Sequence, residues 1–127
     1  MSEIQILALY GLLVIATLIL QATGTMTQLG LGYLLGSRDE SRSISGITAR
    51  LERALNNSIT AMVLFAPAVL LLVVSENTSN QSILAAQAFL IARIIYVPAY
   101  AFGVVGVRSL AWTIGIFATI ALYLLAL

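Results

Sequence analysis

Four long apolar segments constrain the fold of this chain more than any other feature of its sequence. They cover residues of about 4–35, 46–74, 83–102 and 109–127, with short polar connections between them. A helix of about 20 predominantly apolar residues is long enough to cross the hydrocarbon core of a bilayer. Of the 127 residues, 61% are hydrophobic and 9% are charged, whereas soluble domains have about 25% charged residues. The sequence therefore predicts an all-α integral membrane protein, with one domain (1–127) that forms a four-transmembrane-helix bundle.

Two of these segments are expected to depart from straight, lipid-facing helices. At about 1.5 Å per residue, the segment 4–35 is longer than the hydrocarbon core of about 30 Å, so it must tilt, kink or project past the membrane. Its second half carries a polar run, Gln21 to Gln28, which should face other helices. Pro67 lies inside the segment 46–74 and is expected to kink it.

The arginines lie on one side of the predicted bundle. Because successive spans alternate in direction, the polar loop 36–45 and the turn after the third helix share a side. That side holds Arg38, Arg42, Arg50, Arg53 and Arg108, whereas the opposite side has only the acids Glu3 and Glu76. The positive-inside rule therefore predicts a cytoplasmic arginine-rich loop, with both termini outside.

Several kinds of chemistry lose their usual residues in this chain. It contains no cysteine, histidine or lysine, so we expect no disulfide, no metal site of the zinc or haem type, and no histidine base. The net charge of +1 gives no reason to expect nucleic acid as a partner. The expected surroundings are the lipid bilayer itself.

Arg93 is the exception within the third apolar segment. It lies near the centre of a stretch from Ile83 to Val105, where an arginine costs about 2.5–3.5 kcal/mol on insertion scales. Such a residue normally faces the bundle interior or a wet cavity and has a partner. All five acids of the chain lie at helix ends or in loops. The partner is therefore expected to be a helix-end carbonyl, a Gln or Thr of the first helix, a neighbouring subunit or a bound anion.

Two polar stripes are predicted to meet beside Arg93. Arg53, Asn57 and Thr60 are spaced i, i+4, i+7 and share one face of the second helix. Arg93 and Tyr100 are seven residues apart and share a face of the third helix.

Tyr96 lies slightly off this second face. The two stripes could line a cleft that opens to the cytoplasm, where arginine is suited to binding carboxylates. The alternative is that the arginines and tyrosines at the helix ends only contact lipid headgroups, as in an interfacial aromatic belt.

These stripes carry a resemblance to the MAPEG superfamily, the membrane-associated proteins in eicosanoid and glutathione metabolism. The matching pieces are Glu-Arg-Ala at 52–54, Asn57, Ala-Arg at 92–93, Ala-Tyr at 99–100 and Val-Arg-Ser-Leu at 107–110. The run Gly-Leu-Gly-Tyr-Leu-Leu-Gly-Ser-Arg-Asp, 30–39, looks like the end of the first helix in bacterial members. The similarity covers essentially the whole chain.

The resemblance implies a homotrimer in a bacterial inner membrane that binds glutathione between subunits near the cytoplasmic side. It implies a glutathione-dependent transferase or peroxidase, with a lipophilic electrophile arriving from the bilayer. The positions that it assigns to glutathione binding are Arg53, Asn57, Thr60, Arg93 and Tyr96.

Arg108 and Tyr100 are the candidate catalytic residues, which would stabilise the thiolate. Asn56 replaces a position that is often basic in the family, and a second departure matters more, because Thr60 stands where the family has a glutamate. In active members that acid helps to hold the amino end of glutathione. This departure favours the alternative, a non-catalytic member that binds a lipid or an amphiphile. A proton-coupled transporter is disfavoured, since such carriers need a carboxylate within the membrane.

Overall fold

The structure, a computed structural model that describes residues 1–127, contains helices as its only regular secondary structure. The elements are α1 (Glu3–Leu29), α2 (Leu31–Leu35), α3 (Gly46–Val74), α4 (Asn80–Ala101) and α5 (Val105–Ala126). The four long helices are each long and apolar enough to cross a membrane. The prediction of an all-helical chain with four potential spans is therefore confirmed.

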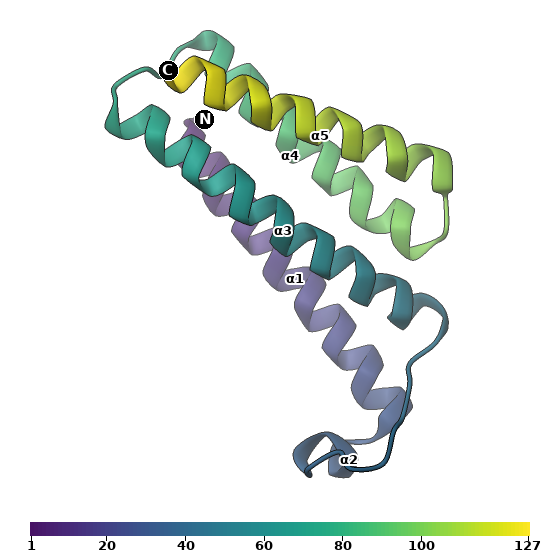
Figure 1. Cartoon of the computed structure of the whole chain (residues 1–127). Helices are drawn as coiled ribbons and strands as arrows, with labels where there is room; N and C mark the ends of the chain where they lie inside the picture. The colour runs from purple at the N-terminus through teal and green to yellow at the C-terminus, as the bar shows by residue number, and fades with distance from the viewer.

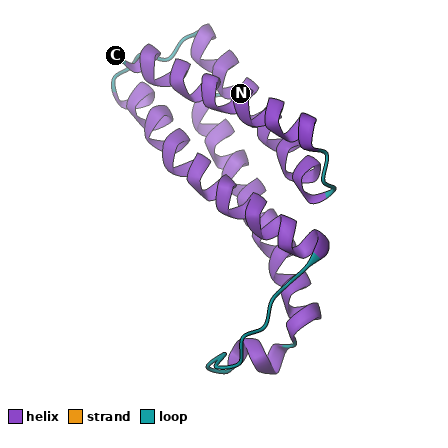
Figure 2. Ribbon diagram, turned by 45° about the vertical axis from the view of Figure 1, so that its right-hand side comes forward, coloured by secondary structure: helices purple, strands orange, loops and turns teal.

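The long helices form an up-and-down bundle (Figure 1). Contacts join α1 to α3 and α4, and α5 to α3 and α4, so α1 and α5 lie at opposite corners. Both termini and the α3–α4 turn lie at one end of the bundle (Figures 1 and 2). The other end, which we call the arginine-rich end, holds the α2–α3 loop and the α4–α5 turn. There the Arg50 Nε donates to the backbone oxygen of Ala101 at 2.7 Å.

The first apolar segment is not one continuous helix, so the predicted helix 4–35 is wrong in its second part. The chain breaks at Gly30, whose φ of 86° lies in the region that favours glycine, and resumes as the short α2. The end of α1 projects past α4 and α5 (Figure 1). Its polar half contacts α3, where the side-chain amide of Gln28 makes two hydrogen bonds to the Ser45 backbone.

Two other predicted boundaries are also corrected. Helix α4 starts at Asn80 and not at 83, because Ser79 and Ser82 form a capping box at its N-terminus. Helix α5 starts at Val105 and not at 109. Helix α3 runs through Pro67 as one element, and the predicted kink at this proline stays a prediction.

An aromatic cluster anchors the helices beside the polar residues. The rings of Phe65 and Phe89 stack at 3.8 Å between centroids, 5° from parallel. Tyr10 meets both rings edge-on, with centroids at 6.0 and 4.8 Å. All three side chains are buried. The cluster therefore fixes how α1, α3 and α4 are rotated toward one another, and with it the direction in which their polar side chains point.

Candidate functional site

Arg93 is buried between helices and is held by neutral groups. Its side chain is 2% exposed. One terminal nitrogen donates to the Asn57 Oδ1 and the other to the Ser58 Oγ, both at 2.9 Å. Its guanidinium also lies 4.0 Å from the centroid of the Tyr96 ring. Both acceptors come from α3, whereas the sequence predicted a helix-end carbonyl, a Gln or Thr of the first helix, a neighbouring subunit or a bound anion.

Two members of this network, Tyr10 and Ser58, were not predicted from the sequence. The Tyr10 hydroxyl donates to the backbone oxygen of Ser58 at 2.7 Å, in a buried position. Polar contacts thus run across the bundle from α1 through α3 to Arg93 on α4. Tyr10 is the only phenol in the apolar half of the first helix, and this is the signal that could have identified it.

Two further arginines gather around the ring of Tyr100. The guanidinium carbons of Arg108 and Arg53 lie 4.3 and 5.9 Å from its centroid. The ring of Tyr96 lies 5.7 Å from that of Tyr100. The structure therefore brings together the predicted stripes of the second and third helices, and adds Arg108 from the start of α5.

A hollow of about 470 Å³ lies beside this cluster. It is lined by Asn57, Tyr96, Arg108, Ser109, Trp112 and Thr113. We call this hollow, together with Arg53 and Tyr100 at its side, the arginine cleft. The one salt bridge of the chain, Arg42–Glu40, lies away from it in the exposed α2–α3 loop. Neither Arg53 nor Arg108 therefore forms a salt bridge within the chain. Both cations remain available to an anionic ligand.

The other three arginines serve helix ends. Arg38 and Arg42 donate to the backbone oxygens of Leu34 and Leu29, in the last turns of α2 and α1. Arg50 donates to Ala101 at the end of α4. Cations are favourable at these positions, because helix C-termini have unpaired carbonyls and a partial negative charge. These three arginines therefore stabilise helix ends, and none of them belongs to the arginine cleft.

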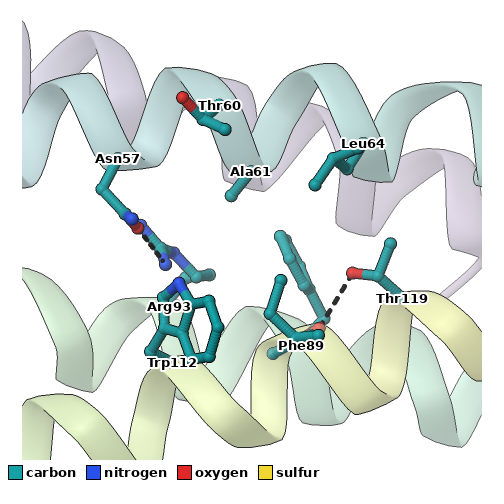
Figure 3. A pocket seen from close by; sticks show the side chains of 10 residues that line it. Asn57, Thr60, Ala61, Leu64, Phe89, Arg93, Trp112 and Thr119 are labelled. Atoms are coloured by element: carbon teal, nitrogen blue, oxygen red, sulfur yellow. Dashed lines mark hydrogen bonds between the residues drawn. The ribbon is translucent and has the colours of Figure 1, made fainter.

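A second hollow lies deeper, between α3, α4 and α5 (Figure 3). We call this hollow of about 180 Å³ the deep cavity. Thr60 lines it and is not at the arginine cleft, and its hydroxyl donates to the backbone oxygen of Asn56 at 3.1 Å. Asn57 and Trp112 line both hollows. The two sites are therefore adjacent, with Asn57 and Trp112 between them.

Comparison with known protein families gives one match. The model of the MAPEG family matches residues 5–127, nearly the whole chain. No curated protein and no solved structure matches.

Proposed function

Because this chain belongs to the MAPEG family, a superfamily of membrane proteins of glutathione and eicosanoid metabolism, we propose that it binds glutathione in the arginine cleft. We further propose that it transfers the glutathione thiolate to lipophilic electrophiles, or uses it to reduce peroxides. The observation that carries this proposal is the placement of Arg53 and Arg108 around Tyr100 without a carboxylate partner.

The donors of the arginine cleft suit the chemistry of glutathione. The tripeptide carries two carboxylates, and guanidinium groups bind carboxylates through charge-assisted hydrogen bonds. A nearby cation also favours the thiolate form of a thiol, which is its nucleophilic form. Arg108 is half-buried at the cleft, so its charge is less screened than that of an exposed arginine. In this proposal Arg53 and Asn57 bind the tripeptide, and Arg108 or Tyr100 stabilises the sulfur.

Arg93 and Tyr96 take an indirect part in this proposal. Both are at least 96% buried, at 2% and 4% exposure. Arg93 fixes the Asn57 side chain through the bond to its Oδ1, which leaves the amide NH₂ of Asn57 for a ligand. Tyr96 packs beside Tyr100 and lines the cleft.

Thr60 supports a second candidate function, a non-catalytic member that binds a lipid or an amphiphile. Its position faces the deep cavity and its hydroxyl is bonded to its own helix. Position 60 therefore offers no acid for the amino end of glutathione. In this alternative an amphiphile places its anionic head by Arg108 and its apolar part along α5.

Calorimetric titration of glutathione into the purified protein tests the proposal. Arg53→Ala and Arg108→Ala each remove a cation of the cleft, and each should weaken binding about tenfold or more, the change expected from one lost charge-assisted hydrogen bond. Arg38→Ala is the matched control, because it removes an arginine from the same end but outside the cleft. If the parent does not bind millimolar glutathione, or if all three variants weaken binding alike, the proposal is wrong. Co-purified lipid would then identify the alternative.

A further inference from the structure

A polar groove lies between α1 and α3 at the arginine-rich end. We call this hollow of about 370 Å³ the α1–α3 groove. Helix α1 contributes Gln21 and Thr25 to its lining, and α3 contributes Glu52 and Arg53. Arg53 also lies beside the Tyr100 ring of the arginine cleft. The groove and the cleft are therefore adjacent, with Arg53 common to both.

Glu52 and Arg53 present opposite charges to this groove without neutralising each other. The one salt bridge of the chain is Arg42–Glu40, and neither Glu52 nor Arg53 makes a side-chain hydrogen bond. Consecutive residues leave a helix about 100° apart, so their side chains do not face one another. The two charges are therefore both free to bind a ligand.

The other charges of the groove are already used. Arg38 and Arg42 also line it, but their guanidinium groups are held by the carbonyls at the ends of α2 and α1. Glu52 is the only carboxylate in the lining. The groove thus offers one free anion and one free cation, an arrangement that suits a zwitterion whose ammonium group and anion lie close together.

The α1 side of the groove adds a free donor and a free acceptor. The side-chain nitrogen of Gln21 donates to the Thr25 Oγ1 at 2.7 Å. Three other threonines of α1, Thr17, Thr23 and Thr27, donate their hydroxyl hydrogen to the backbone oxygen four residues earlier. Thr25 makes no such bond, so its hydroxyl hydrogen and the side-chain oxygen of Gln21 are left for a ligand.

From these observations we infer that Glu52 binds the α-ammonium group of glutathione, while Arg53 and Thr25 bind the carboxylate attached to the same carbon. An ammonium group and a carboxylate on one carbon require an acid and a cation that line one groove without pairing with each other. The inference rests on the proposed function and adds to it a residue for the amino end of the tripeptide. Glu52 differs in place from Thr60, which lines the deep cavity.

The arginine cleft is within reach of a ligand bound in this way. The guanidinium carbons of Arg53 and Arg108 lie 5.9 and 4.3 Å from the centroid of the same ring, that of Tyr100. The γ-glutamyl and cysteinyl parts of glutathione span about 7 Å or more when extended, at about 3.5 Å per residue. With its amino end in the groove, glutathione can therefore place its sulfur near Arg108.

An analogue of glutathione without the ammonium group, glutaryl-cysteinylglycine, tests the inference. Calorimetric titration gives the Kd of each ligand for the purified protein. In Glu52→Gln the affinity for glutathione relative to the analogue should fall about three- to fivefold from the parent's value, the effect of an ion pair open to solvent. This comparison isolates the pairing of one side chain with one ligand group, as a double-mutant cycle does.

Two further variants show whether the change is specific. Asp39→Asn is the matched control, because it removes an acid from the same end of the bundle that does not line the groove. It should leave the relative affinity at the parent's value. Thr25→Val should weaken both ligands alike, by about threefold, because the carboxylate that Thr25 binds is present in both. Glu52 is exposed and makes no bond in the chain, so Glu52→Gln should fold as the parent does.

The inference is overturned if Glu52→Gln has the same relative affinity as the parent, or if Asp39→Asn lowers it equally. Glutathione binding that is weakened by Arg108→Ala and unchanged by Glu52→Gln rejects the role of Glu52 alone and leaves the proposed function in place. A parent protein that binds neither ligand at millimolar concentration rejects the proposed function, and the role of Glu52 with it.

Discussion

The guanidinium of Arg93 is stabilised by an amide and a hydroxyl, and not by a carboxylate. Neutral acceptors leave its positive charge without compensation inside the bundle, so each of the two bonds matters for folding. Ser58 is central, because its hydroxyl accepts from Arg93 while its backbone oxygen accepts from Tyr10. At the scale of single residues, the two bonds to Ser58 link α1, α3 and α4.

Ser58→Ala should destabilise the protein by about 1.5–3 kcal/mol, the range for a hydrogen bond to a charged group. The change removes the acceptor of one Arg93 nitrogen and leaves that nitrogen buried. Thermal unfolding in detergent measures the effect as a lower melting temperature. Ser41→Ala, in the exposed α2–α3 loop, is the control and should leave the melting temperature unchanged. Equal melting temperatures for both variants would show that water or lipid replaces the lost acceptor.

Tyr10→Phe should have a smaller effect, about 0.5–1.5 kcal/mol, because the Ser58 carbonyl is a neutral acceptor. The ring remains against Phe65 and Phe89, so the aromatic packing is kept. Tyr123→Phe is the comparison, since its hydroxyl also donates to a backbone oxygen, that of Leu64, but at an exposed position. Unfolding by denaturing detergent should show the larger loss for Tyr10→Phe, and the reverse order would contradict a buried network.

Helices α1 and α3 pack closely against each other near the arginine-rich end, at Gly24 and Thr48. A Cβ at Gly24 would lie 2.3 Å from the Thr48 Oγ1, which no side chain can tolerate without movement. Small residues at such crossings allow helix backbones to approach closely, which is how membrane helices associate. At the scale of elements, Gly24 therefore sets how near α1 comes to the start of α3, which carries Arg53.

Gly24→Ala should destabilise the bundle, although alanine is the better helix former by about 1 kcal/mol. Thr48→Ala in the same chain removes the clashing oxygen and should restore much of the lost stability. Gly11→Ala is the control on the same helix, where an added methyl makes an ordinary contact, and it should be neutral or stabilising. Melting temperatures of the four proteins test this order. A stabilising Gly24→Ala would show that α1 and α3 are too far apart for Gly24 to contact Thr48.

The distribution of arginine predicts the orientation of the whole molecule in the membrane. Five of the six arginines lie at one end of the bundle or near it, and the opposite end has none. From the positive-inside rule we propose that the arginine-rich end faces the cytoplasm. Since the chain has no cysteine, single cysteines introduced at the two ends are unambiguous reporters of this orientation.

Ser41→Cys and Thr78→Cys should react differently with a membrane-impermeant maleimide added to intact cells. Thr78 lies in the α3–α4 turn at the arginine-free end, so it should be labelled from outside. Ser41 lies in the α2–α3 loop and should be labelled only after the membrane is permeabilised. The opposite labelling pattern would put the arginine cleft outside the cytoplasm, where glutathione is scarce, and would count against the proposed function.

At the scale of the whole molecule, family membership leads us to expect that three chains assemble into a trimer. In the single chain, Arg53 is exposed and also lines a groove with Gln21 and Thr25 of α1. Polar side chains at this depth are better placed against protein than against lipid. Native mass spectrometry should therefore give the mass of three chains, and a monomer that still binds glutathione would contradict an intersubunit site.

Local properties of the sequence were enough to determine the membrane spans of this protein and the placement of its polar residues along them. The four spans, the arginine-rich end and the two polar stripes depend on segment length, hydropathy and helical period, which neighbouring residues along the chain define. Only the tertiary structure decided the partners of Arg93, because Asn57 and Ser58 lie 36 and 35 positions away from it. It also decided that Thr60 lines the deep cavity between α3, α4 and α5, and not the arginine cleft. Such contacts depend on how the helices are rotated and how closely they approach, and these are set by the packing of all the side chains between them.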